Sequence, residues 1–351
     1  MYLLVINPGS TSTKVGLSQD GELLAVKTLQ HAPEEMRRFR NVMDQKEIRR
    51  RAVEGFLSQQ GLSPNGLAAV AARGGLLDPV PSGTYAVNAR MLEHLLTAKN
   101  GEHASNLGAV LAKALADRAG IPAFVVDPPS VDELEDWARF SGRPELPRVS
   151  FLHALNIRRA ILRCAAGLGK PLPTCHFVAV HLGGGISVVA VKEGRIVDVS
   201  NANHGGPFSP ERSGSLPARE LLHLCFSGRY GEMELRRQIN GKSGLLGYLG
   251  TNSGQEIEER IERGDEEAGR IFRAMAYQIA KEIGAMAAVL PQIDGLIYTG
   301  GLAHSELLLG FIQEYVGSLA PVFRLPGEDE LTALAEGAYR VLSGKEEVRV
   351  Y

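Results

Sequence analysis

Cysteine is scarce in this sequence, and the few that occur are not arranged for cross-linking or for holding a metal. Cys164, Cys175 and Cys225 are an odd number and show no CxxC spacing. A disulfide framework needs paired cysteines, and a zinc site of the usual type needs closely spaced ones. We therefore expect a cytoplasmic protein whose reduced thiols pack as small hydrophobic side chains.

Long apolar runs and an excess of one charge are also missing. No stretch approaches the roughly 18 apolar residues of a membrane span, and the apolar run after Met1 ends at Ile6, too early for a secretory signal. The formal net charge is −2, which gives nucleic acid or an anionic membrane no overall attraction. We expect neither of them as a partner.

Several familiar catalytic motifs are absent as well. Gly241-Lys242-Ser243 looks like the end of a P-loop, but Arg236 stands where the first glycine of that motif belongs. Gly183-Gly184-Gly185 lacks the third glycine of a dinucleotide-binding turn and precedes a β-branched strand rather than a helix. No HExxH or GxSxG occurs. The chain is therefore not a P-loop protein, and its triple-glycine turn is of another kind.

The pattern that the chain does contain is a strand, a turn of small residues and a second strand, and it occurs twice. Residues 3–15 place such a turn around Gly9, and residues 178–189 place another at Gly183-Gly184-Gly185. Turns of this kind expose backbone N–H groups, which bind phosphate. Two copies half a chain apart predict a duplicated domain whose turns face each other across a cleft and grip one nucleotide.

The similarity of the two copies extends beyond these turns. Asp20-Gly21 and Glu193-Gly194 occupy corresponding positions and predict tight hairpin turns into third strands near residues 22–29 and 195–200. Each copy is thus expected to form a three-stranded antiparallel meander.

Two further buried strands are predicted to end in charged residues. The apolar runs 67–72 and 121–126 are followed at once by Arg73 and Asp127. Strand ends of this kind hold active sites in α/β proteins. The alternative for Asp127 is that it caps the turn before Pro128.

The length of 351 residues exceeds the roughly 250 to 300 at which a single core stops growing, so two α/β domains are expected. We assign residues 1–150 and 151–330 to them, with the last helix, about 331–351, packing back on the first. An irregular connection is expected over 139–148. Helices are predicted over 33–60, 102–119, 264–290 and 331–342.

Six arginines lie in the first predicted helix, residues 33–60, but acidic residues are interleaved with them. We interpret this pattern as a solvated helix face rather than a polyanion site.

Five segments, in order and over the whole length, resemble the acetate and butyrate kinase family. They are residues 7–14 (NPGSTSTK), 102–108 (EHASNLG), 208–215 (FSPERSGS), 242–247 (KSGLLG) and 326–330 (PGEDE). Within this family the sequence most resembles the butyrate kinase branch. The resemblance lies in the residues around Arg73, in the His153-Ala-Leu-Asn segment and in the triple-glycine turn.

The resemblance implies a fold, an activity and cofactors. The fold would be the duplicated, two-domain actin/hexokinase-like (ribonuclease H-like) ATPase fold of the α/β class. The activity would be reversible, Mg²⁺-dependent transfer of phosphate from ATP to butyrate, with acetate, propionate or a branched short-chain acid as alternatives. A homodimer or higher homo-oligomer formed through the second domain would be expected.

The family's site residues map onto this sequence. By resemblance, Arg73 and Arg212 would neutralise the transferring group, although Arg73 lies a few residues later than in acetate kinases, and His153 would stabilise the transition state. Nucleotide phosphates would contact Asn7, Ser10, Ser12, Lys14, His103, His181, Gly183, Gly184 and Gly185, and the adenosine would contact Gly300 and Gly301. The remaining histidines are expected to be packed or solvated.

By the same resemblance, magnesium would be held by Asn7, Asp127 and Asp329, and Glu330 and Glu328 are alternatives to Asp329. Asp127 is also a candidate catalytic residue. An acidic cluster that only caps the last helix is the competing interpretation. Leu152 stands where the family often has phenylalanine, so it is expected to border the acyl pocket.

A different class of function also fits a duplicated ATP-binding fold. The chain could be a non-enzymatic actin-like ATPase module in which hydrolysis drives domain motion. The clustering of Arg73, His153 and Arg212 favours the kinase, because a water nucleophile needs no carboxylate site.

Overall fold

The computed structural model describes residues 1–201 and 203–351 and divides them into two compact units. Unit 1 comprises Met1–Asp132 and Asp329–Tyr351, and unit 2 comprises Glu133–Glu328. The division into domains 1–150 and 151–330 stays a prediction. The predicted irregular connection is confirmed, since residues 140–153 form no helix or strand.

Unit 1 is built on a mixed sheet of order β12-β5-β6-β4-β1-β2-β3. Its strands are β1 (Tyr2–Pro8), β2 (Ser12–Gln19), β3 (Glu22–Gln30), β4 (Ala69–Arg73), β5 (Thr84–Ala86), β6 (Ala123–Val126) and β12 (Arg349–Val350). β1, β2 and β3 form the predicted antiparallel meander, and β4 runs parallel to both β1 and β6. Because these three strands are parallel, their carboxyl ends bring Asn7, Arg73 and Asp127 to one sheet edge.

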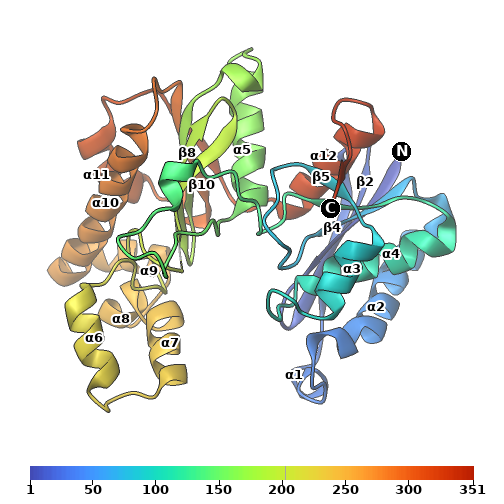
Figure 1. The fold of residues 1–351 in the computed structure, drawn as a ribbon, viewed down its shortest axis with the longest axis horizontal. Helices are drawn as coiled ribbons and strands as arrows, with labels where there is room; N and C mark the ends of the chain where they lie inside the picture. Colours follow the sequence, from blue (N-terminus) through green and yellow to red (C-terminus); the bar gives the residue numbers. More distant parts are fainter. Residues whose placement is uncertain (202) are drawn as a thin grey trace. The chain divides into compact units, whose positions relative to one another are not determined.

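The helices of unit 1 cover both faces of this sheet. They are α1 (Pro33–Met36), α2 (Lys46–Gln59), α3 (Ala89–Leu96), α4 (Asn106–Ala119) and α12 (Glu330–Leu342), with short 3₁₀ turns at Val42–Gln45 and Pro64–Gly66. Leu4 and Ile6 pack with Phe56 of α2 and Leu107 of α4, and alternate residues of the strands face α12. Figure 1 shows α2, α3 and α4 together in this unit.

The single helix predicted over 33–60 is wrong. The segment is broken into α1, a 3₁₀ turn and α2, and Asn41 between them has extended dihedral angles. Asn41 N–H donates to the Asp44 carboxylate, a local hydrogen bond that competes with continuing the helix. The helix predicted over 102–119 likewise begins only at Asn106.

Unit 2 repeats the topology of unit 1. Its sheet has the order β11-β10-β7-β8-β9, with β7 (Phe177–Leu182), β8 (Ile186–Lys192), β9 (Arg195–Ser200), β10 (Gly295–Gly300) and β11 (Val322–Pro326). These five strands correspond in order to β6, β4, β1, β2 and β3 of unit 1. As there, the first three are parallel to one another and the last two pairs are antiparallel. Even the register shift recurs, between Leu17 and Ser18 and between Ala190 and Val191. The predicted duplication of the strand–turn–strand unit is confirmed.

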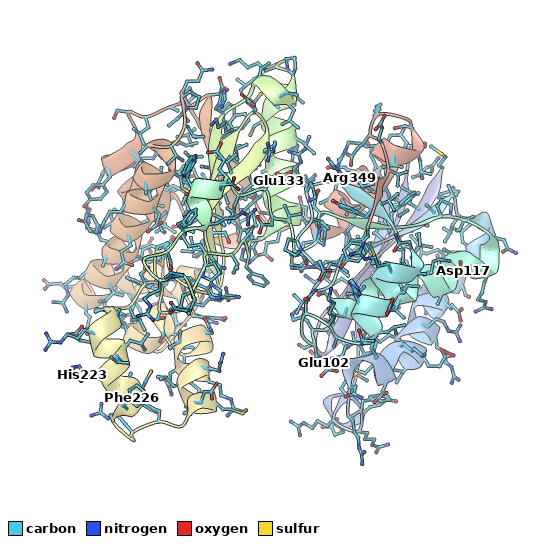
Figure 2. All side chains as sticks on the ribbon, in the orientation of Figure 1. Glu102, Asp117, Glu133, His223, Phe226 and Arg349 are labelled. Atoms are coloured by element: carbon cyan, nitrogen blue, oxygen red, sulfur yellow. The ribbon has the colours of Figure 1, made fainter. Side chains whose placement is uncertain are left out.

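Helices enclose this second sheet too. They are α5 (Ala154–Gly167), α6 (Ala218–Phe226), α7 (Glu232–Gly241), α8 (Gly244–Leu249), α9 (Gly254–Glu262), α10 (Glu266–Ala287) and α11 (Glu306–Val316), with 3₁₀ turns at Asp136–Arg139, Leu172–Thr174 and Gly301–His304. α10 and α11 share a core with one face of the sheet, and α5 packs on β7 and β10. Figure 1 shows α6 and α7 beyond the end of this sheet, and His223 and Phe226 are labelled on α6 in Figure 2.

No helix in the described part of the chain is long and apolar enough to cross a membrane.

Candidate active site

In unit 1, the predicted residues gather around one cavity of about 540 Å³ beside the first small-residue turn. Ser10 and Lys14 are exposed and flank the turn between β1 and β2, and the cavity also reaches Arg73 and Glu330. The predicted site residues that line it are Asn7, Ser10, Ser12, Lys14, Arg73, His103 and Glu330. The structure thus brings together residues that are far apart in the sequence.

Glu330 links two of these residues. Its carboxylate accepts hydrogen bonds from Asn7 Nδ2 and from Arg73 Nη1, the latter at 2.5 Å. Glu330 is the first residue of α12, where the helix dipole favours a carboxylate. The Asn7 side-chain oxygen and the Glu330 carboxylate are hard oxygen donors, and Mg²⁺ prefers such donors together with phosphate oxygens and waters. The donor set at this cavity therefore fits the predicted metal.

The loop that carries Arg73 is held against α4. The Asn106 side chain accepts the Leu76 N–H at 2.9 Å and donates to the carbonyl of Gly101. A Cβ on Gly108 would lie 2.2 Å from the Arg73 carbonyl oxygen, so only glycine allows the helix to approach the strand end this closely. This packing explains the Asn-Leu-Gly motif at the start of α4.

The other predicted residues of unit 1 are placed as follows. Asp127 is buried, has a φ of 37°, and its Oδ1 accepts the Gly83 N–H at 2.7 Å. Asp329 is exposed and directly precedes α12. His103 Nδ1 lies 2.7 Å from Ser105 Oγ, and partial desolvation, with the Arg73 charge as the second cause, lowers the pKa of His103.

In unit 2, two predicted histidines stack on each other beside the triple-glycine turn. The rings of His153 and His181 are 3.8 Å apart at an interplanar angle of 12°. His153 is the N-terminal cap residue of α5, and its Nδ1 lies 3.1 Å from Ser187 Oγ.

The His181 ring is fixed by a chain of side-chain and backbone contacts. Asn156 Nδ2 donates to the Gly327 carbonyl, so the Asn156 oxygen faces His181 Nδ1 at 2.8 Å and assigns the proton to that nitrogen. His181 Nε2 is buried with no hydrogen-bond partner among the described residues, and Glu328 Oε1 lies 3.2 Å away. This nitrogen is at the base of the turn, because a Cβ on Gly183 would lie 2.9 Å from it.

Arg212 lies directly over the triple-glycine turn. A Cβ on Gly185 would be 2.6 Å from Arg212 Nη1, so glycine is what admits the guanidinium. Ser209 Oγ donates to the Gly184 carbonyl at 2.6 Å and accepts the Arg212 N–H, which fixes the loop to the turn. Burial lowers the pKa of Arg212 and the Glu211 carboxylate opposes that shift, but arginine stays charged at any physiological pH.

Gly300 and Gly301 lie at the end of β10, where the Gly300 backbone forms two hydrogen bonds with Gly327. Gly300 is buried with a φ of 88°, and Gly301 is exposed.

Several residues that build these sites were missed by the sequence prediction. Asn156 and Ser209 lie in the motifs that carry the family resemblance but received no role, Ser187 lies outside those motifs, and all three position predicted residues. Arg49 was assigned to a solvated face, and this is wrong, because it is fully buried beneath the first turn. The signal that identifies it is its spacing, since Arg49, Val53 and Phe56 form one stripe of α2 at i, i+4 and i+7.

Known proteins resemble this chain over nearly its whole length. The model of the acetokinase family matches residues 159–309. A probable butyrate kinase 2 of Caldanaerobacter subterraneus subsp. tengcongensis is 49% identical over 350 residues, covering 99% of each chain. Butyrate kinase 2 of Clostridium acetobutylicum is 46% identical over 351 residues, with the same coverage.

The chain belongs to the acetokinase family. Members of this family are carboxylate phosphotransferases, which is the enzyme class that the motifs predicted.

Solved structures agree on the fold. The acetate kinase of Porphyromonas gingivalis superposes with a TM-score of 0.78 at 19% identity, covering 96% of this chain and 98% of that one. A propionate kinase of Francisella tularensis subsp. tularensis gives 0.77 at 18% identity, with 96% and 99% covered. The predicted two-domain actin/hexokinase-like fold is confirmed.

The position of Arg212 generates a test. Gly185→Ala places a methyl group against the guanidinium and should displace it, which we expect to lower kcat about 100-fold, the typical effect of a small misplacement at a reacting centre. Gly241→Ala adds the same methyl group where nothing lies within 4 Å and is the control. Equal, near-normal kcat for both variants would show that Arg212 does not need this glycine.

Proposed function

We propose that the protein is a butyrate kinase that reversibly transfers the γ-phosphoryl group of MgATP to butyrate, or to a close short-chain relative, by direct in-line displacement. The observation that carries the proposal is the cluster in unit 2, where Arg212, His153 and His181 surround a phosphate-type turn. The names of relatives 46% and 49% identical over the whole chain support butyrate as the acid.

The chemistry explains why the site is rich in cations and needs no general base. A short-chain acid has a pKa of roughly 4 to 5 and is already ionised at neutral pH, so its oxygen attacks phosphorus without losing a proton. The bond from phosphorus to the ADP oxygen breaks, and ADP leaves with that electron pair. The main cost is bringing two anions together, which cations offset.

Each cationic group has a proposed task. The Arg212 guanidinium, fixed over Gly185, neutralises the oxygens of the phosphoryl group in transfer, because its fork matches them in a way that lysine does not. His153, stacked on His181, donates a hydrogen bond to the same group. Arg73, tethered by Glu330, orients the acid or the phosphoryl group from unit 1.

The nucleotide is proposed to contact backbone and side chains of both turns. Ser10, Ser12, Lys14 and His103 serve the phosphates from unit 1, and His181 with Gly183, Gly184 and Gly185 serves them from unit 2. Gly300 and Gly301 border the adenosine.

Magnesium is proposed to be held by Asn7 and Glu330, with Asp127 and Asp329 at the same sheet edge. When bound, it neutralises charge on the phosphate oxygens. We also propose a cytoplasmic homo-oligomer. Exposed apolar side chains on the α6–α8 region of unit 2, Leu222, Phe226, Met233 and Tyr248, support association of copies.

Trapping the product with hydroxylamine tests the activity. Purified enzyme with MgATP should form acyl hydroxamate only when butyrate is present, and ADP release should match it. Phosphate release that does not depend on any acid would instead identify a non-enzymatic actin-like ATPase module.

Arg212→Ala should lower kcat by roughly 10³ to 10⁵, the range for losing an arginine that stabilises a phosphoryl group in flight. The KM for ATP should change far less, because the interaction strengthens only in the transition state. Steady-state kinetics with butyrate measure both quantities. A tenfold fall in kcat, or a change in KM alone, is incompatible with this role.

Leu152 generates a prediction about the acid. It is buried, directly before His153, and we propose that it lines the acyl pocket. Leu152→Phe should lower kcat/KM for butyrate and isobutyrate while sparing acetate, because the phenyl ring fills the space that the longer acyl chains occupy. Each methylene of the acyl chain that can no longer be buried costs about 0.8 kcal/mol of binding. Kinetics with the three acids provide the test, and an equal loss for all three would place the acyl pocket elsewhere.

A further inference from the structure

Arg49 is a fully buried arginine whose every N–H group is engaged. It lies on α2, and its exposed fraction is 0%. Nη1 donates to the Ser12 carbonyl at 2.8 Å and to Thr13 Oγ1 at 2.9 Å, and Nη2 donates to the Ser10 carbonyl at 2.9 Å. Nη2 and Nε both donate to Gln45 Oε1. These contacts use all the donors of a guanidinium.

The partners of Arg49 are all neutral. They are two carbonyls, a hydroxyl and an amide, and none of the ion pairs found among the described residues includes Arg49. Burial lowers the pKa of Arg49 to about 10. A buried cation without a carboxylate is costly for the fold, so stability alone is a poor reason for its presence.

The contacts set the direction of the peptide groups in the first turn. The Ser10 carbonyl accepts a hydrogen bond from Arg49, and the Thr11 carbonyl accepts the His31 N–H at 2.9 Å. In a planar trans peptide the N–H points opposite to the carbonyl. The Thr11 N–H is therefore directed away from the buried guanidinium, and the Ser12 N–H is directed away from the His31 backbone.

A small polar network extends this support. Thr13 Oγ1 accepts from Arg49 and lies 2.9 Å from His31 Nε2, so its hydroxyl hydrogen is available to that nitrogen. Gln45, which accepts twice from Arg49, also lines the cavity that contains Ser10, Ser12 and Lys14. The guanidinium thus joins the back of the turn to the wall of the cavity.

We propose that Arg49 is a positioning residue for phosphoryl transfer: its fork fixes the backbone of the Gly9–Ser12 turn so that the turn presents its N–H groups to a phosphate in the cavity. The inference rests on the proposed function, since it assigns the anion to the nucleotide. This role depends on the shape of the guanidinium, so a positive charge of another shape at position 49 does not replace it.

Two substitutions separate geometry from charge and volume. Arg49→Lys keeps the charge but cannot reach the Ser10 and Ser12 carbonyls together, and Arg49→Met keeps only the approximate volume. Both should lower kcat about 100-fold while leaving the KM for butyrate unchanged. Arg50→Met is the matched control, because among the described residues Arg50 pairs with Glu47 and Glu54 alone, both on its own helix. A lysine variant with normal kcat would overturn the proposal.

Hydrogen exchange provides a readout that needs no activity. The N–H groups of Gly9 and His31 are bonded to the carbonyls of Ser12 and Thr11 and should exchange slowly in the native protein. In Arg49→Lys they should exchange at least tenfold faster, with core amides such as Val5 unaffected. Unchanged exchange at these amides would contradict the positioning role whether or not the enzyme makes acyl phosphate, so the two proposals fail separately.

If the Arg49 variants do not fold, Thr13→Val takes their place. It is similar in volume to the threonine it replaces and removes one of the five hydrogen bonds of Arg49. It should shift kcat and the Gly9 and His31 exchange rates in the same direction by a smaller factor. Native kcat with native exchange in this variant would also overturn the proposal.

Discussion

In each unit, hydrogen bonds tie down carbonyl groups of the small-residue turn. In unit 1, Arg49 and the His31 N–H take the carbonyls of Ser10, Thr11 and Ser12. In unit 2, Ser209 Oγ takes the Gly184 carbonyl. In the proposed reaction, the N–H groups on the opposite side of each turn bind an anion, and because the carbonyls are held these donors need not reorganise. The duplicated sheet topology supplies the same scaffold twice.

The charges around these turns differ in how firmly they are held. Arg49 is completely enclosed by neutral acceptors, Arg73 is tethered by a single carboxylate, and Arg212 is half-buried against a glycine. Arg49 is fully buried, which suits the proposed task of fixing backbone, whereas Arg73 and Arg212 are only half-buried, which suits their proposed contacts with substrate and with the group in transfer. His153 stacks on the His181 ring, and Asn156 fixes that ring through its Nδ1.

The sequence predicts much of the fold because its main signals are local. Neighbouring residues are enough to recognise these signals. They are the apolar runs that form strands, the Asp20-Gly21 and Glu193-Gly194 turns, and the strands that end in Arg73 and Asp127. The contacts of Glu330 with Asn7 and Arg73, and of Asn156 with His181, join segments that no local pattern connects. The prediction placed Arg49 on a solvent-exposed helix face because acidic residues lie near it in the sequence. Its side chain is instead buried, because it donates hydrogen bonds to the carbonyls of Ser10 and Ser12 in the first turn.

In the proposed reaction, a carboxylate oxygen of the acid attacks the γ-phosphorus of ATP. The most direct measurement is ³¹P nuclear magnetic resonance of the reaction with MgATP and butyrate labelled with ¹⁸O in both carboxylate oxygens. The account predicts an acyl phosphate whose phosphorus signal carries the isotope shift of one bridging ¹⁸O. Unlabelled inorganic phosphate as the sole product, formed at the same rate without butyrate, would contradict it.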